Sequence, residues 1–128
     1  MLKPLLGALA LFDLVLGGVA LASPDLFSDL LWHASPPEDW ALIRRTGVLW
    51  LFFSLAEMVA WRDPGDPKKL RFVALLRWMD VPADAVWWWF AEGFSRLGQI
   101  GIGVAPIFNL LLGIFFWREA KKKVSRER

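Results

Sequence analysis

Apolar residues dominate four stretches of the chain, and polar or breaker-rich segments separate them. Each stretch approaches the ~20 apolar residues that a helix needs to cross a bilayer. Their bounds are about residues 4–22, 41–61, 71–90 and 97–117. The pattern therefore predicts an all-α membrane protein, folded as a bundle of four transmembrane helices.

Composition supports a membrane protein, since 56% of the 128 residues are hydrophobic, with nine Trp, ten Phe and no Tyr. Little chain is left for anything else, so we expect a single integral membrane domain over residues 1–128. Because there is no cysteine, disulfides, thiolate metal sites, thiol redox chemistry and cysteine nucleophiles are excluded. We interpret His33, the one histidine, as a polar residue of the first loop rather than a ligand.

The first segment also has features of a secretory signal peptide. Lys3 precedes a long apolar run, and residues 20–22, Ala-Leu-Ala, resemble a cleavage site. However, Asp13 interrupts the apolar run. We therefore interpret residues 4–22 as the first spanning helix.

The distribution of lysine and arginine predicts the orientation. Basic residues gather in the loop after the second span and in the tail, residues 118–128: Arg62, Lys68, Lys69, Arg71, Arg118, Lys121, Lys122, Lys123, Arg126 and Arg128. Acidic residues gather in the first loop: Asp25, Asp29, Glu38 and Asp39. Both termini should thus be cytoplasmic, in a multi-pass membrane protein. The tail is interpreted as a topology signal that also meets anionic lipid headgroups, with a protein docking site as the alternative. Nothing in the pattern favours nucleic-acid binding.

Turn and cap signals mark the loops. Residues 23–25, Ser-Pro-Asp, combine an N-cap with proline at the first helical position, which predicts a short helix along the outer interface. Residues 35–38, Ser-Pro-Pro-Glu, are a second start signal, so the second long helix should include Arg44 and Arg45. Residues 63–67, Asp-Pro-Gly-Asp-Pro, form a strong helix breaker.

Small and polar residues form one stripe on each of three spans, and charges mark the remaining one. The stripes are Ala10, Asp13, Gly17 and Ala20; Gly47, Trp50, Ser54 and Glu57; and Gly101, Ala105, Asn109 and Gly113. Small residues permit close helix approach, so Asp13 should point inward. In the third span Arg77, Asp80 and Asp84 share one face. We interpret the stripes as helix packing; a pathway for solutes is the alternative.

Depth along the helices suggests charge partners, at ~1.5 Å per residue. Glu57 and Arg77 lie at similar depths from the cytoplasmic side, so antiparallel neighbours should pair them. Nearer the outer face, Asp84 comes within reach of Arg44 or Arg45. Such pairing lowers the cost of a charge in the bilayer.

The inward charges are unequal in number. Four acids, Asp13, Glu57, Asp80 and Asp84, stand against three bases, Arg44, Arg45 and Arg77. Burial and like-charged neighbours favour the neutral form of a carboxyl group. Asp13 or Asp80, which lie at a similar depth, is therefore the candidate for a functional acid or a ligand contact. The simpler interpretation is that these charges form structural ion pairs.

The Asp80-x-x-x-Asp84 pair is like the motifs that hold magnesium diphosphate in membrane prenyltransferases. Those enzymes use two such motifs in a much larger helical bundle, and Arg77 beside this pair would oppose a cation. We therefore predict no metal, no cofactor and no catalytic residue.

One family resemblance arises from the same elements. Residues 23–27, Ser-Pro-Asp-Leu-Phe, end the first span, residues 45–47, Arg-Thr-Gly, lie early in the second, and Arg71 and Arg77 lie in the third. With these elements the chain resembles the DoxX-like group of small four-helix bacterial membrane proteins. The resemblance implies a fold more than an activity, and it makes Arg45, Gly47 and Arg77 the recurring positions. It also implies a location in a bacterial cytoplasmic (inner) membrane.

Two hypotheses for the function result. The leading one is a noncatalytic integral membrane protein that binds a lipid-like small molecule or serves as an accessory subunit of a membrane complex. Its site would be the inward face formed by Asp13, Glu57, Arg77, Asp80 and Asp84. The alternative is a small membrane enzyme or proton-coupled carrier with a buried aspartate as its acid–base group. Expected partners are membrane lipids and a membrane protein or a second copy, because the Gly101-x-x-x-Ala105 pair permits association.

Overall fold

The computed structural model describes residues 2–32, 40–90 and 92–126. These residues form five α-helices: α1 (Leu2–Ala22), α2 (Pro24–Leu31), α3 (Trp40–Arg62), α4 (Pro67–Phe90) and α5 (Arg96–Arg126). They include no strand, so the all-α prediction is confirmed for the described part of the chain. The predicted short helix is present as α2. His33 and the start signal at residues 35–38 lie outside the described residues.

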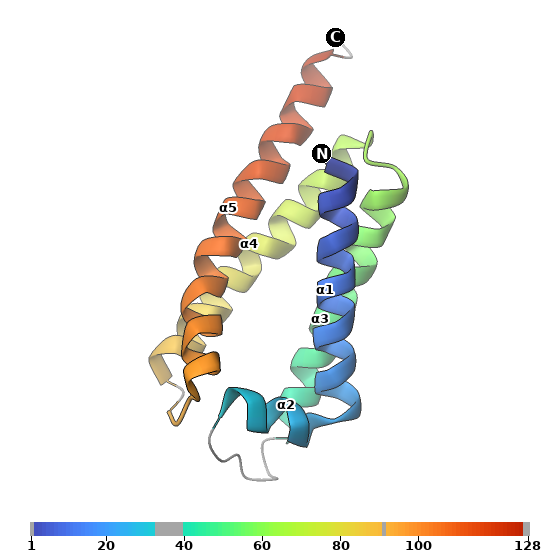
Figure 1. The fold of residues 1–128 in the computed structure, drawn as a ribbon. Helices are drawn as coiled ribbons and strands as arrows, with labels where there is room; N and C mark the ends of the chain where they lie inside the picture. Colours follow the sequence, from blue (N-terminus) through green and yellow to red (C-terminus); the bar gives the residue numbers. More distant parts are fainter. Residues whose placement is uncertain (1, 33–39, 91, 127–128) are drawn as a thin grey trace.

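The long helices associate in two pairs, α1 with α3 and α4 with α5 (Figure 1). At one end of the molecule, the α2 end, α2 contacts α1, α3 and α5. At the opposite end, which we call the turn end, lie the start of α1, the turn at residues 63–66 and the end of α5 (Figure 1). Helices α3 and α4 lie close together at their turn and separate toward the α2 end (Figure 1).

Helices α1 and α5 are long and apolar enough, by length and composition, to cross a membrane. Helices α3 and α4 have 23 and 24 residues, but charged residues interrupt their apolar stretches, with Arg44, Arg45 and Glu57 on α3 and Arg77 and Asp80 on α4. By length and composition alone, therefore, two of the described helices, α1 and α5, are candidate membrane spans. The four-span bundle remains a prediction at this point.

The turn between α3 and α4 has the caps that its sequence predicts. Helix α3 ends at Arg62, and α4 begins at Pro67. The carboxylate of Asp66 accepts a hydrogen bond from the backbone N–H of Lys68 at 2.8 Å, which caps the first turn of α4. Proline at the first helical position costs no hydrogen bond, because that N–H would have no helical partner.

Helices α1 and α3 cross where two glycines meet. A Cβ atom added to Gly17 would lie 2.7 Å from the carbonyl oxygen of Gly47, and one added to Gly47 would lie 2.8 Å from that of Gly17. Only residues without a Cβ atom allow this approach. Further along, Ser54 Oγ donates a hydrogen bond to the carbonyl of Ala10 at 2.7 Å. The small-residue stripes of the first two spans therefore lie against each other.

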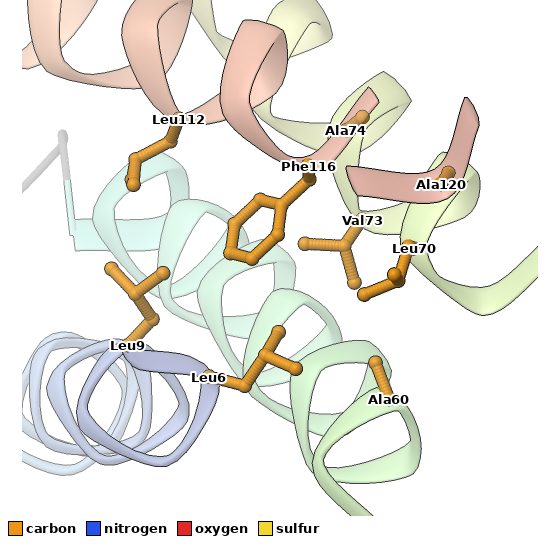
Figure 2. Packing of buried hydrophobic residues seen from close by; sticks show 9 residues of the cluster. All are labelled: Leu6, Leu9, Ala60, Leu70, Val73, Ala74, Leu112, Phe116 and Ala120. Carbon is orange, nitrogen blue, oxygen red and sulfur yellow. The ribbon is translucent and has the colours of Figure 1, made fainter. Parts of the chain in front are cut away.

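An apolar core joins all four long helices toward the turn end. Its buried residues are Leu6, Leu9, Ala60, Leu70, Val73, Ala74, Leu112, Phe116 and Ala120. Phe116 of α5 is fully buried and lies among these side chains (Figure 2). This core connects the α1–α3 pair to the α4–α5 pair.

At the α2 end, Ser95 links α2 to α5. Its backbone N–H donates to the carbonyl of Leu31 at 2.8 Å, and its hydroxyl donates to that of Leu30 at 2.7 Å. The same hydroxyl accepts a hydrogen bond from the N–H of Gly98 at 3.0 Å, so Ser95 also caps α5. Gly98 is buried beside the carbonyl of Leu31, where a side chain would not fit. The two helix pairs are thus joined at both ends.

The outer surface of the long helices is strongly apolar. Exposed large side chains occur on every one of them, for example Phe12, Leu49, Phe72 and Phe108. Met79 is 68% exposed, whereas Arg77, two residues earlier on α4, is 3% exposed. Apolar groups therefore face outward while several charged groups face inward, the reverse of a water-soluble helical protein.

Candidate functional site

One group of buried and half-buried polar side chains has members on all four long helices. It consists of Asp13 on α1, Glu57 on α3, Arg77, Asp80 and Asp84 on α4, and Asn109 on α5. We call it the charged cluster. It brings together the five residues of the predicted inward face and adds Asn109.

Arg77 is the centre of the charged cluster. Its Nη2 donates to Asp13 Oδ2 at 2.5 Å, and its Nε donates to Glu57 Oε1 at 3.0 Å. The same Nη2 also donates to Glu57 Oε1, so two carboxylates meet one guanidinium nitrogen. The planar guanidinium with its five N–H donors suits this arrangement, whereas the single ammonium of a lysine would not. The expected pairing of Glu57 with Arg77 is present.

Asn109 connects Arg77 to the other two acids. Its Oδ1 accepts a hydrogen bond from Arg77 Nη1 at 3.2 Å. Its Nδ2 then donates to Asp80 Oδ2 at 2.9 Å and to Asp84 Oδ2 at 3.2 Å. Sequence reasoning assigned Asn109 to helix packing only. One feature of the sequence could have indicated this bridging role: Asn109 is the single asparagine of the chain and lies on the small-residue stripe of α5. That stripe faces α4, which carries the two aspartates.

The expected pairing of Asp84 with Arg44 or Arg45 is not formed. Both arginines are exposed near the α2 end of α3, and neither makes an ion pair within the described residues. Asp84 instead lies in the contact between α4 and α5 and binds Asn109. The reason is the arrangement of the helices, because α3 and α4 separate toward the α2 end (Figure 1).

The predicted packing stripe of α5 is divided between two environments. Asn109 and Gly113 are buried, and the backbone of Gly113 lies directly against the indole of Trp78. Ala105 is half-buried. Gly101 is exposed, and a Cβ atom added there would meet nothing within 4 Å. The half of the stripe with Asn109 and Gly113 therefore packs against α4, while Gly101 does not take part in this packing.

The charged cluster has more hydrogen-bond acceptors than donors. Glu57 is 1% exposed, and within the described residues its Oε2 has no hydrogen-bond partner. Asp80 and Asp84 share a single amide nitrogen of Asn109. Neither forms an ion pair with any residue of the described ranges. One arginine is thus the nearest cation for four carboxyl groups.

A cavity of about 300 Å³, open to the surface of the protein, lies between α4 and α5 on the α2 side of the charged cluster. Its lining residues are Ala85, Trp88, Trp89, Ile102, Gly103 and Pro106. Asp84 is one helical turn before Trp88 on α4, and Asn109 is three residues after Pro106 on α5. The charged cluster is therefore the next group of residues beside the cavity along both helices, before it on α4 and after it on α5. The volume is at the lower end of the range for small-molecule sites.

No group of three His, Cys, Asp or Glu side chains in the described ranges is placed to hold a metal ion. The Asp80-x-x-x-Asp84 pair is present on one face of α4, with both carboxylates bonded to the amide of Asn109. The described side chains thus form no closed metal centre.

No family model, curated protein or solved structure matches the chain. The resemblance to the DoxX-like group therefore stays a prediction that depends on residues 23–27 and 45–47 and on Arg71 and Arg77.

Proposed function

We propose that the chain is an integral membrane protein in which α1, α3, α4 and α5 all cross the bilayer. The apolar outer surface of the four helices supports this, because in lipid such a surface needs no further cover. Buried charges support it as well. A charged side chain inside a bilayer nearly always faces the interior of a bundle and is paired there, as Glu57 and Arg77 are.

The charges on α3 and α4 are compatible with crossing. Glu57 and Arg77 are buried and bonded to each other, and the half-buried Asp80 accepts a hydrogen bond from Asn109 of α5. Arg44 and Arg45 lie within six residues of the start of α3, where long basic side chains extend to the interface. The lower hydrophobicity of α3 and α4 is thus due to residues that face the inside of the bundle or lie near a helix end.

The orientation we propose has the turn end in the cytoplasm of a bacterium, with the protein in its inner membrane. Lys68, Lys69 and the basic residues 118–123 gather at that end, as the positive-inside rule requires of cytoplasmic segments. Trp61 and Trp117 lie there beside Lys3 and Arg71. Tryptophans beside basic residues are typical of a membrane–water interface.

For this membrane protein we infer a noncatalytic role, the binding of a lipid-like small molecule. The observation that carries the inference is the apolar cavity between α4 and α5, whose lining residues Ala85 and Pro106 come directly after Asp84 and three residues before Asn109. A largely apolar lining with aromatic side chains is the usual form of a small-molecule pocket. A role as accessory subunit of a membrane complex is compatible with the same site.

Native mass spectrometry of the purified protein tests this proposal. We expect a bound small molecule on the wild-type protein and its loss from Gly103→Leu, because a Cβ atom added at Gly103 would lie 3.2 Å from the indole of Trp88 and a larger side chain would fill the cavity. Gly101→Leu is the matched control, since a side chain there meets open space. Recovery of only unliganded protein, with no partner in a mild-detergent pull-down, would contradict both the binding and the accessory role.

The second candidate is a small membrane enzyme or proton-coupled carrier. It is favoured by Asp13 and Glu57, which meet the same nitrogen of Arg77 while Glu57 Oε2 has no partner in the described residues. Such a pair of carboxyl groups can hold a proton. A pH-sensitive dye inside proteoliposomes would report proton movement. This candidate expects movement that Asp13→Asn abolishes and that Asp25→Asn, at an exposed position of α2, preserves.

A further inference from the structure

We propose that Arg71 of α4 and Lys121 of α5, at the turn end, bind the phosphate of an anionic phospholipid in the cytoplasmic leaflet. This inference depends on the proposed function, since it requires that α4 and α5 cross the bilayer with the turn end on the cytoplasmic side. It adds a second site, because none of the residues that line the cavity takes part.

The guanidinium of Arg71 is held in place without a charged partner. Its central carbon lies 5.6 Å from the centre of the Trp117 ring, a cation–π contact between α4 and α5. Trp117 in turn packs against Trp78, with ring centres 5.4 Å apart. Within the described residues Arg71 forms no ion pair, and its Nε is buried without a hydrogen-bond partner. Such a guanidinium is suited to bind a phosphate, whose oxygens match its planar set of donors.

The described carboxyl groups at the turn end are bound by other cations. Lys69 pairs with Asp63 at 2.8 Å and with Asp66 at 3.6 Å. Lys122 pairs with Glu119 at 2.6 Å. Three basic residues of this end therefore have no carboxylate partner within the described ranges: Lys68, Arg71 and Lys121. The end carries positive charge that an anion from outside the protein would balance.

The packing of α4 on α5 brings Arg71 and Lys121 to the same place. The residues that precede them, Leu70 and Ala120, are both fully buried in one apolar core (Figure 2). Lys121 follows Trp117 by one helical turn, so these two share a face of α5. Arg71 contacts Trp117 on that face. Arg71 is half-buried and Lys121 is exposed, so one anion at the surface can meet both.

The surface next to Arg71 suits the acyl chains of a lipid. Leu75 and Met79 follow Arg71 at successive turns of α4, toward the middle of the proposed bilayer. They are 47% and 68% exposed. Trp117 marks the level of the membrane–water interface, where tryptophan is enriched. A phosphate at Arg71 would thus lie among the headgroups, with its acyl chains along α4.

Other occupants fit less well. A free phosphate ion would meet the positive charges but leave the apolar surface of Leu75 and Met79 unused. A phosphatidylcholine molecule carries its own cation, which offsets the charge of its phosphate and adds a positive group to a basic end. Clusters of basic residues beside a spanning helix are typical of sites for anionic lipids. Charge and surface together favour a phospholipid with a net negative charge.

Native mass spectrometry tests the site with the full chain, released from nanodiscs that contain equal amounts of phosphatidylglycerol and phosphatidylcholine. We expect the wild-type protein to retain phosphatidylglycerol in preference to phosphatidylcholine. Arg71→Gln should lower this retention about tenfold, because charge-assisted hydrogen bonds to the phosphate are lost. Arg62→Gln is the matched control, since it removes an exposed arginine at the end of α3, and it should keep the lipid. Equal losses from the two variants would overturn the inference, because they would indicate a diffuse attraction to the basic end.

A second variant covers the case in which Arg71→Gln lowers the yield of folded protein. Lys121 is exposed, so Lys121→Gln keeps the helix packing and should still weaken retention of phosphatidylglycerol. Retention equal to that of Arg62→Gln would contradict the site. An excess of inorganic phosphate should not displace the lipid; displacement would show that the free anion is the ligand and would overturn the choice of a phospholipid.

The failure of this inference can be told apart from that of the proposed function. Gly103→Leu fills the cavity and should leave the retention of phosphatidylglycerol unchanged. If retention depends on Gly103 and not on Arg71, the lipid belongs to the cavity, and only the inference is wrong. If Gly65→Cys is labelled from outside the cell, the proposed orientation is wrong, and so is the leaflet named here.

Discussion

Arg77 Nη1 donates a hydrogen bond to Asn109 Oδ1 at 3.2 Å, and this bond orients the amide so that its Nδ2 faces Asp80 and Asp84. One arginine on α4 thereby organises carboxyl groups that it does not itself pair with. The charged cluster is consequently a connected network across four helices, and its parts should respond together to mutation.

The first prediction concerns Arg77. Arg77→Met should lower stability by about 3–5 kcal/mol, because removing one partner of a buried ion pair leaves the other charges uncompensated. Thermal unfolding in one detergent measures the loss. Arg44→Met removes an exposed arginine of α3 and is the control, expected to change the midpoint little. Equal midpoints for the two variants would mean that the buried pairs contribute no stability.

The second prediction concerns Asn109. Asn109→Leu should destabilise the protein by about 1–3 kcal/mol, since the two aspartates lose their shared donor. Gln99→Leu removes an exposed amide of the same helix and should be nearly neutral. Chemical unfolding of the two variants beside the wild type is the measurement. A neutral Asn109→Leu would show that the bridge between Arg77 and the two aspartates is dispensable.

The third prediction tests the crossing of α1 and α3. Gly17→Ala should cost about 1–3 kcal/mol, because the added methyl group would lie within van der Waals distance of the Gly47 carbonyl and force the helices apart. Gly18→Ala is the matched control on the next residue, where a Cβ atom meets nothing within 4 Å. The two unfolding midpoints, compared in the same detergent, decide the matter; a pair of equal midpoints would contradict the close contact.

The fourth prediction is a pH effect at the turn end. Lys69 Nζ donates to Asp63 Oδ2 at 2.8 Å, and this hydrogen bond holds the pKa of the Asp63 carboxyl below its usual 3.8. The interaction is therefore complete above the usual pKa and is lost as the pH falls through the lowered one. A carboxyl-carbon NMR titration should find this lowered pKa, and Lys69→Met, which removes the side-chain donor, should raise it toward its usual value. Lys68→Met should leave it lowered.

Much of the fold follows from local patterns in the sequence. The breaker at residues 63–67 and the small-residue stripes around Gly17 and Gly47 predict where helices end and which faces meet, because turn chemistry and close helix approach depend on nearby residues. Asp13, Glu57 and Arg77 converge for the same reason, since each lies on such an inward face.

The rest depends on how whole helices are arranged. Arg44 forms no ion pair with Asp84 within the described residues, since α3 and α4 separate toward the α2 end (Figure 1), and no local pattern reports that separation. The bridging role of Asn109 required knowledge of which residues of α4 lie opposite it on α5. The cavity beside Trp88 likewise exists only where these two helices meet.

The most direct test of the four-span arrangement is to determine on which side of the membrane Gly65 lies. If α1, α3, α4 and α5 all cross and the start of α1 is cytoplasmic, the turn at Gly65 is cytoplasmic and Asp29 is outside. If only α1 and α5 cross, both positions are outside. The chain has no cysteine, so Gly65→Cys and Asp29→Cys each carry a single thiol at an exposed position.

A membrane-impermeant maleimide applied to spheroplasts distinguishes these arrangements. If all four long helices cross, we expect Asp29→Cys to be labelled in intact spheroplasts and Gly65→Cys to be labelled only after the membrane is permeabilised. Labelling of Gly65→Cys in intact spheroplasts to the same extent as Asp29→Cys would contradict the four-span arrangement of the charged cluster.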